Sequence, residues 1–295
     1  MASVGSNRVA GVRETLLSSA SNLGGTGRTG TIQHCGAQPH RGFSHRHLPP
    51  RFSAVNLILF AAAELDRPLA SGDPRACHLR EVLRCGPGTS FDLGVVDGPR
   101  GKGHVTAVAA DGGIQFSVTL GAPPPALPPV HLVIGLPRPQ TARKILQECT
   151  ALGVAALHFV STSRADPNYA QSTLWASQEW RERLLEGAQQ AFCTRLPVVT
   201  SGRPLAAVIE DAPPAWLRLG LDNYEAAAPL ATVPLPPAPP AAWLALGPER
   251  GWDDVDRAVL RAAGFTLVHL GERVLRSETA CIAATAILKA RLGWL

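Results

Sequence analysis

Two arginines and two glutamates crowd the segment Leu270–Ala280, and their types suit proton transfer and anion binding. The four charged side chains are Glu272, Arg273, Arg276 and Glu278. A guanidinium can stabilise negative charge that develops during a reaction, and a carboxylate can accept a proton or orient the guanidinium. Helix capping by Ser277, with Glu278 in the first turn, explains part of this pattern but leaves Arg276 unexplained. The segment is therefore a candidate site.

The hexapeptide Leu246-Gly247-Pro248-Glu249-Arg250-Gly251 is a second candidate. It follows an apolar run that is typical of a buried strand. Open α/β sheets bind ligands at the carboxyl ends of their strands, where glycines let the backbone approach the ligand closely. A plain turn explains a Gly-Pro pair equally well, so the hexapeptide alone leaves both interpretations open.

Several functional classes are excluded by what the sequence lacks. It contains no glycine-rich phosphate-binding fingerprint, no GxSxG elbow and no HExxH pair. The longest apolar run, Val55–Ala63, is interrupted by Asn56 and is far shorter than the ~18 residues that a membrane span needs. The cysteines form no CxxC pair and no cluster with histidines, so we expect neither a metal site nor a disulfide scaffold: Cys35, Cys77, Cys85, Cys149, Cys193 and Cys281.

Both candidate segments lie in a region of alternating strand and helix patterns that begins near residue 130. The predicted strands are Val130–Leu136, Ala156–Val160, Leu217–Leu221, Trp243–Leu246 and Phe265–Leu270. The predicted helices are Thr141–Leu152, Leu174–Phe192, Asp253–Ala263 and Glu278–Leu292. Such alternation predicts a parallel sheet covered by helices on both faces. The last helix is apolar on nearly every side, which predicts that it is buried.

Residues 55–122 have a different pattern of short strands and tight turns, which predicts a compact barrel. The expected strands are Val55–Phe60, Phe91–Val96, Gly103–Val108 and Ile114–Val118, with a helical stretch at Asp73–Leu83. That stretch places Arg80 and Arg84 four residues apart on one helical face. The pair could meet phosphates, or it could simply form a solvated face. A proline-rich link over residues 122–129 ends this region.

Residues 1–54 are rich in Ser, Gly and Arg and show no apolar periodicity, so we expect a disordered extension. Two interpretations stay open: an organelle transit peptide, or a translation start assigned too far upstream. Of the net charge of +5 on the 295 residues, +4 lies in residues 1–50. The basic character of the chain is therefore no sign that its folded body binds polyanions.

Taken together, the motifs resemble the RsmE-type methyltransferases of the SPOUT superfamily, which methylate N3 of a uridine in small-subunit ribosomal RNA. The similarity runs from Val55 to the end of the chain. It rests on Leu246–Gly251, Leu270–Ala280, Gly135–Pro139 with Glu148 and Leu152–Val154, His78–Arg84 and Thr194–Pro197. Two positions depart from the family pattern: Arg250 stands where a glycine is usual, and Ser277 where a threonine is usual.

The resemblance implies an α/β fold in which a small PUA-like β-barrel domain (55–122) precedes a SPOUT methyltransferase domain with a trefoil knot (130–295). It also implies a homodimer with the site near the subunit interface, S-adenosylmethionine as cofactor and no metal. The residues that the resemblance assigns to the cofactor are Leu221, Asp222, Leu246, Gly247, Pro248, Glu249, Gly251, Leu270, Gly271, Val274, Leu275, Arg276 and Thr279.

On this interpretation, Arg276 stabilises the uracil anion that forms when N3 loses its proton. Glu278 either accepts the proton or, as we favour, fixes Arg276 by a charge-assisted contact. Arg80, Arg84, Arg138 and Arg195 are candidates for phosphate contacts with ribosomal RNA, either naked or in the assembled small subunit.

Three other functions are weighed against this one. The chain could be another knotted RNA methyltransferase that modifies a ribose 2′-hydroxyl or a different base. It could be a non-catalytic RNA-binding protein that uses the barrel alone. A nicotinamide-dependent enzyme would need the glycine fingerprint that the sequence lacks. We expect a cytoplasmic protein, or a chloroplast or mitochondrial one if residues 1–54 are a transit peptide.

Overall fold

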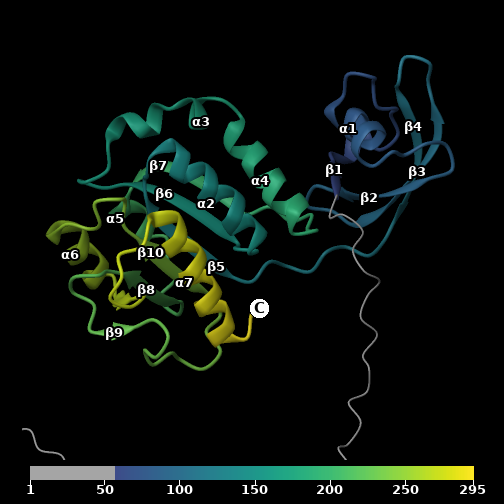
Figure 1. Cartoon of the computed structure of the whole chain (residues 1–295). Coiled ribbons are helices and arrows are strands. Elements are labelled where there is room, and N and C mark those ends of the chain that lie inside the picture. The colour runs from purple at the N-terminus through teal and green to yellow at the C-terminus, as the bar shows by residue number, and fades with distance from the viewer. Residues whose placement is uncertain (1–56) are drawn as a thin grey trace, which may run out of the picture. The chain divides into compact units, whose positions relative to one another are not determined.

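The computed structural model describes residues 57–295, which form two β-sheets connected by the proline-rich link (Figure 1). Our predictions for residues 1–54, and for the start of the first strand at Val55, lie outside the described residues. Within residues 57–295, no helix is both long and apolar enough to cross a membrane. The same residues contain no cluster of His, Cys, Asp and Glu side chains that could hold a metal ion.

The first sheet has the strand order β1-β2-β3-β4, in which β1 runs parallel to β2 and the other neighbours are antiparallel. Its strands are β1 (Ile58–Phe60), β2 (Ser90–Val95), β3 (Arg100–Val108) and β4 (Ile114–Leu120). A short 3-10 helix, η1 (Ala62–Glu64), follows β1. The sheet packs around Phe60, Leu79 and Leu93, which are fully buried. The predicted short strands are confirmed.

The helical stretch in this region is shorter than expected, and one prediction about it is wrong. It consists of α1 (Pro74–Cys77), which continues into a π-helical turn, η2 (His78–Val82). Arg84 lies beyond that turn with a left-handed backbone, φ 52°. Arg80 and Arg84 therefore do not share a helical face, because the helix ends between them.

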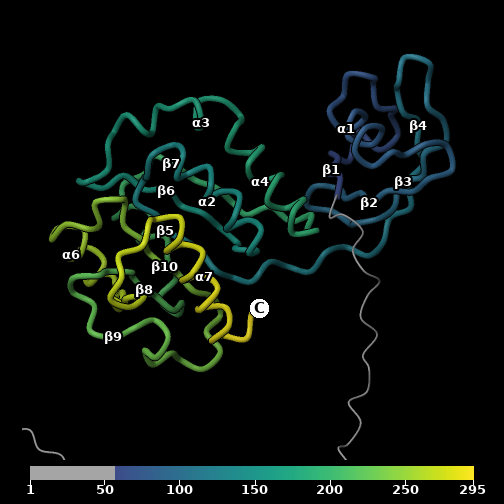
Figure 2. Tube along the Cα trace, viewed as in Figure 1, coloured from purple at the N-terminus to yellow at the C-terminus, as the bar shows by residue number. Residues whose placement is uncertain are grey.

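The second sheet consists of seven strands, and every neighbouring pair is parallel. Figure 2 follows the course of the chain through this sheet. Its order is β7-β6-β5-β10-β8-β11-β9, so that β10 lies between β5 and β8. The strands are β5 (Val130–Gly135), β6 (Ala156–Ser161), β7 (Val198–Pro204), β8 (Leu217–Leu221), β9 (Ala228–Pro229), β10 (Ala242–Leu246) and β11 (Thr266–His269). Because all are parallel, their carboxyl ends share one edge of the sheet.

Helices cover both faces of this sheet, as predicted. Apolar side chains of α2, α4 and α7 pack against one face in the largest core cluster, and those of α5 and α6 pack against the other. Their bounds are α2 (Pro139–Ala151), α4 (Glu179–Gln190), α5 (Leu205–Ile209), α6 (Asp254–Ala262) and α7 (Ser277–Leu292). Two short elements, η3 (Pro167–Gln171) and α3 (Thr173–Ala176), precede α4.

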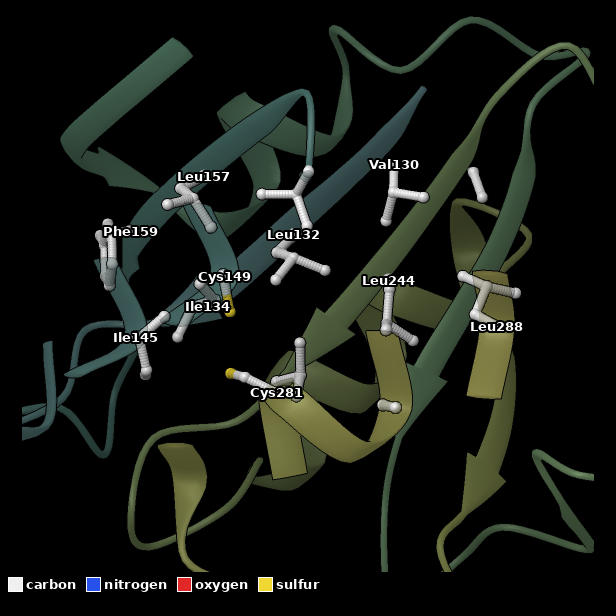
Figure 3. Packing of buried hydrophobic residues seen from close by; sticks show 14 of the residues in the cluster. Val130, Leu132, Ile134, Ile145, Cys149, Leu157, Phe159, Leu244, Cys281 and Leu288 are labelled. Atoms are coloured by element: carbon white, nitrogen blue, oxygen red, sulfur yellow. The ribbon is translucent and has the colours of Figure 1, made fainter. Parts of the chain in front are cut away.

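The α7 helix is buried against α2 and the central strands, as its apolar sequence predicts. Figure 3 shows Cys281 of α7 and Cys149 of α2 among the side chains of β5, β6 and β10. The hydrogen bond between the two thiols and their complete burial raise the pKa of Cys281 well above its ordinary value. Both cysteines are free thiols that act as small apolar residues in this core.

Three local predictions need correction. The expected helix Leu174–Phe192 is interrupted at Ser177, whose backbone is extended, and so divides into α3 and α4. The strand β7 and the five-residue helix α5 were not predicted, because β7 is a largely exposed edge strand with a mixed sequence. The predicted cap Ser277 is instead the first residue of α7. The N-cap of this helix is Arg276, whose side chain makes no capping hydrogen bond. By contrast, the predicted helix Asp253–Ala263 is confirmed as α6, which begins with a capping box formed by Asp253 and Asp256.

Two histidines stack with tryptophans on the α5 and α6 face of the sheet. The ring of Trp243 lies 5.1 Å from that of His158, with 9° between their planes, and Nδ1 of His131 lies 3.3 Å from Nε2 of His158. Burial, and then the neighbouring His158, lower the pKa of His131 to about 4. Burial also lowers the pKa of His158; Arg203 lowers it further and Asp211 opposes the change.

This stack predicts an acid-sensitive fold. A histidine whose pKa is lower in the folded state than in the unfolded chain favours the folded state while it is neutral. That contribution is complete above the unfolded pKa of about 6.5 and is lost as the pH falls toward about 4. The thermal midpoint should fall across this window, and His131→Phe should flatten the fall. His104→Phe, at an exposed position, is the control and should leave the pH dependence of the thermal midpoint unchanged. An equal dependence on pH in the two variants would contradict the role given to His131.

Candidate functional site

The two candidate segments line one cavity of about 210 Å³ at the carboxyl edge of the second sheet, where β8, β10 and β11 end. The predicted cofactor residues on its wall are Leu221, Asp222, Leu246, Gly247, Pro248, Glu249, Gly251, Leu270, Val274 and Leu275. The other three, Gly271, Arg276 and Thr279, belong to the same loop and helix but do not line the cavity. Segments that are far apart in the sequence thus form a single site.

A buried ion pair holds the loop that follows β8. Nε of Arg257 donates a hydrogen bond of 2.7 Å to Oδ2 of Asp222, and the two side chains are only 6% and 1% exposed. The other carboxylate oxygen accepts the backbone N–H groups of Tyr224 and Glu225 at 2.7 and 2.8 Å. Burial raises the pKa of Asp222, but Arg257 and these two N–H groups outweigh it, so that the pKa lies below its ordinary value. Asp222 is therefore a charged brace for this loop.

The loop after β10 fits closely against the end of β5. A Cβ atom on Gly135 would lie 2.4 Å from Cδ and 2.6 Å from N of Pro248, closer than real side chains approach. A Cβ atom on Gly247 would lie 3.0 Å from the backbone of Gly251. The left-handed position of this loop is Gly251, with φ 68°, while Arg250 is not among the residues with positive φ. The arginine in place of the usual glycine is therefore compatible with the fold of the loop.

The rim of the cavity carries apolar side chains that face solvent. Tyr224 is 78% exposed and Val274 is 80% exposed, and both line the cavity. Val255, near the start of α6, is 68% exposed. Below the rim, Nε1 of the buried Trp252 donates to the carbonyl of Leu221 at 3.0 Å and so ties the loop after β10 to the end of β8.

The predicted catalytic residues lie where α7 begins. Arg276 is its exposed N-cap, and its side chain donates no hydrogen bond to any residue from 57 to 295. The Glu278 side chain is 14% exposed and accepts a hydrogen bond of 3.2 Å from Nζ of Lys144. Burial raises the pKa of Glu278, but its own backbone N–H, Lys144 and the charge of Arg276 outweigh burial and lower it. Of the four charged side chains in this loop, Glu278 is largely shielded from solvent, while Glu272, Arg273 and Arg276 are exposed.

The four arginines proposed for phosphate contacts have different surroundings. Arg80 donates to the carbonyls of Ser71 and Gly112, and Arg195 donates to those of Asp97 and Pro124. These two guanidiniums already hold loops of their own fold. Arg84 is exposed, and Arg138 is exposed beside Glu249, whose Oε1 accepts its backbone N–H at 3.0 Å.

Seven residues of the cavity wall are absent from the predicted cofactor residues: Asn223, Tyr224, Arg250, Trp252, Arg273, Ser277 and Ala280. Arg250, Arg273, Ser277 and Ala280 belong to the two candidate segments, whereas sequence reasoning missed Asn223, Tyr224 and Trp252 altogether. Asn223 and Tyr224 continue the loop that begins at Asp222, so the extension of that motif could have found them. Ser277 and Ala280 lie three residues apart on the first turn of α7 and share a face. The indole of Trp252 gave no signal, because its partner is a backbone carbonyl 31 residues away.

Comparisons with known proteins identify sequences that are similar to this chain. A sequence model of the RNA methyltransferase domain matches residues 124–289. The chain is 31% identical over 246 residues to ribosomal RNA small subunit methyltransferase E of Treponema pallidum, across 80% of this chain and 91% of that protein. It is 32% identical over 219 residues to the protein of the same name in Synechocystis, across 73% and 70%.

A solved structure shares the fold. Ribosomal RNA small subunit methyltransferase E from Neisseria gonorrhoeae, bound to S-adenosyl methionine, aligns with a TM-score of 0.65 over 80% of this chain and 97% of that one. At 22% identity, this likeness establishes the common fold, which spans most of the part of the chain that the structure describes. The α/β architecture with its seven-stranded parallel sheet is thus one in which a methyltransferase is known.

The buried pair of Asp222 and Arg257 predicts a large loss of stability when one partner is neutralised. Asp222→Asn keeps the shape of the side chain but removes the one buried counter-charge of Arg257, whose other partners, Asp254 and Glu225, are more exposed. The change should lower the free energy of unfolding by about 3–5 kcal/mol. The control is Arg261→Gln, which removes an exposed pair with Glu225 and should cost less than about 1 kcal/mol. Urea unfolding measures both; similar small losses would show that the buried pair is not a brace.

Proposed function

The chain belongs to the ribosomal RNA small subunit methyltransferase E family, and we propose that it transfers the methyl group of S-adenosylmethionine to N3 of a uridine in small-subunit ribosomal RNA. The observation that carries this proposal is the convergence of three loops, after β8, β10 and β11, on one cavity with Arg276 beside it. The same proposal assigns the protein to the compartment that assembles the small subunit, the cytoplasm of a bacterial cell.

The cavity suits S-adenosylmethionine because loops that contain glycine, after β10 and β11, form much of its wall. Gly247 leaves a cradle that a Cβ atom would fill, since that atom would lie 3.0 Å from Gly251. We assign the adenine and ribose to the backbone around Leu246, Gly247, Gly251, Leu270 and Leu275. Asp222 acts through the loop it braces, because both of its carboxylate oxygens are already engaged. When bound, the cofactor supplies an electrophilic methyl group.

Arg276 is the residue that we assign to the methyl acceptor. A neutral uracil N3–H is a poor nucleophile, and the loss of its proton spreads negative charge over O2 and O4. A guanidinium at that position would stabilise the anion. The exposure of Arg276, and its lack of hydrogen-bond partners within residues 57–295, leave its five N–H donors available for a substrate.

Glu278 has a positioning role in this proposal. Its lowered pKa keeps it ionised at neutral pH and makes it a weak proton acceptor. Its hydrogen bond goes to Lys144 of α2, and its charge also acts on Arg276. We therefore propose that Glu278 holds Lys144 in place and orients Arg276 electrostatically, in place of the direct Arg276 contact that we favoured from the sequence.

The finer architecture is part of the same proposal. We assign residues 55–122 to a PUA-like RNA-binding barrel and residues 130–295 to a SPOUT domain with a trefoil knot. The mixed four-stranded sheet supports the first assignment, and the insertion of β10 between β5 and β8, with α7 packed beside it, supports the second. The exposed Tyr224, Val255 and Val274 support a homodimer that covers the rim of the cavity.

Arg276→Ala should lower methyl transfer by about 100- to 1,000-fold, because the developing anion loses its stabilising charge. Binding of S-adenosylmethionine, measured by calorimetry, should survive, since backbone groups hold the cofactor. Transfer of labelled methyl to small-subunit RNA gives the rate, and mass spectrometry of that RNA with and without the gene identifies the modified base. Arg181→Ala, at an exposed position of α4, is the control. Full activity of the Arg276 variant would remove this residue from the mechanism.

Gly135→Ala should weaken cofactor binding roughly tenfold or more, because its new methyl group would push Pro248 and the loop after β10 into the cavity. Gly72→Ala is the matched control, since no heavy atom lies within 4 Å of its added Cβ. Calorimetric titration with S-adenosylmethionine measures both variants. An unchanged affinity in the Gly135 variant would mean that the loop does not shape the cofactor site.

A further inference from the structure

A second cavity, of about 590 Å³, opens beside the first. Its wall includes Arg138, Arg164, Asp166, Tyr169, Glu249 and Arg250. Glu249 and Arg250 also line the cofactor cavity, so the two cavities are separated only by the loop after β10. A molecule in the second cavity would therefore touch the same loop that lines the proposed cofactor cavity.

The charges of this second cavity favour an anion. Both acidic residues are engaged: Glu249 accepts hydrogen bonds from Arg138, and Asp166 accepts the backbone N–H of Asn168 at 2.9 Å. Nη1 of Arg164 donates to the carbonyl of Arg250 at 3.0 Å, which leaves its other N–H groups without a partner in residues 57–295. The Arg250 side chain makes no polar contact there either. Two guanidiniums thus present unused donors, which match phosphate oxygens.

Tyr169 adds a flat apolar surface to the same cavity. It lies in η3, is half-buried and packs against the main core, so its ring is held in place. Proteins that bind unpaired nucleotides combine cationic side chains for the backbone with aromatic rings on which bases stack.

We propose that this cavity binds the nucleotide adjacent to the target uridine, with Arg164 and Arg250 on its phosphate and Tyr169 against its base. The inference rests on the proposed function and identifies a substrate subsite for it. Ser163, next to Arg164, contacts Asp253 at the start of α6, and Arg164 contacts the loop after β10. These two links fix the subsite relative to the cofactor cavity.

The test measures binding of a fluorescent small-subunit RNA fragment that the unaltered protein methylates. Arg164→Gln and Arg250→Gly should each weaken RNA binding roughly five- to tenfold and reduce the slope of log K against log salt by about one. Tyr169→Leu should weaken binding without a change in that slope, because stacking releases no counterions. Arg181→Gln, at an exposed position outside both cavities, is the matched control.

The outcomes separate this inference from the proposed function. S-adenosylmethionine affinity should stay within about twofold in Arg164→Gln, which does not line the cofactor cavity. If the unaltered protein methylates the RNA while the double variant Arg164→Gln/Arg250→Gly keeps its RNA affinity and salt slope, the subsite is refuted and the function stands. Failure of the unaltered protein to methylate any RNA would refute the function itself.

Discussion

The pairing of β10 with β5 on one side and β8 on the other is the constraint on which the site depends. Strands that are parallel end at the same edge, so this insertion brings the loops after β8, β10 and β11 together around one cavity. The close fit then requires glycine at position 135, where the neighbouring loop leaves no room for a side chain. The chemistry of the site follows from this packing, because no single segment contains all of its parts.

Much of the fold could be predicted because its helices and strands are encoded by residue patterns that are local in the sequence. The apolar run of β5, the capping box of Asp253 and Asp256 and the Gly-Pro turn after β10 are all visible within a few residues. The site loops were found for the same reason. The partners of their charges were not, since Arg257 reaches Asp222 from 35 residues away and Lys144 reaches Glu278 from 134. The break between α3 and α4 and the edge strand β7 could not be predicted, because neither shows a clear periodicity of apolar residues.

The arginines show how burial and partners divide residues of one type among different tasks. Arg257 is buried and neutralises a carboxylate, while Arg80 and Arg195 hold backbone carbonyls of their own loops. Arg276 and Arg250 keep their donors free in the part of the chain that the structure describes. The sequence alone could not distinguish these arginines, because their burial and hydrogen-bond partners are known only from the structure. Arg250 and Arg276 thus have available donors beside the cavity at the ends of β8, β10 and β11, although the described body carries little net charge.

The alkylation rate of the paired thiols of Cys149 and Cys281 can report on the opening of the core. Only a thiolate reacts readily with electrophiles, and these two sulfurs are fully buried, with the pKa of Cys281 raised. An alkylating reagent can reach them only after α7 separates from α2. Their rate of modification therefore reports how often the last helix, whose first turn lies beside the cavity at the ends of β8, β10 and β11, separates from the core.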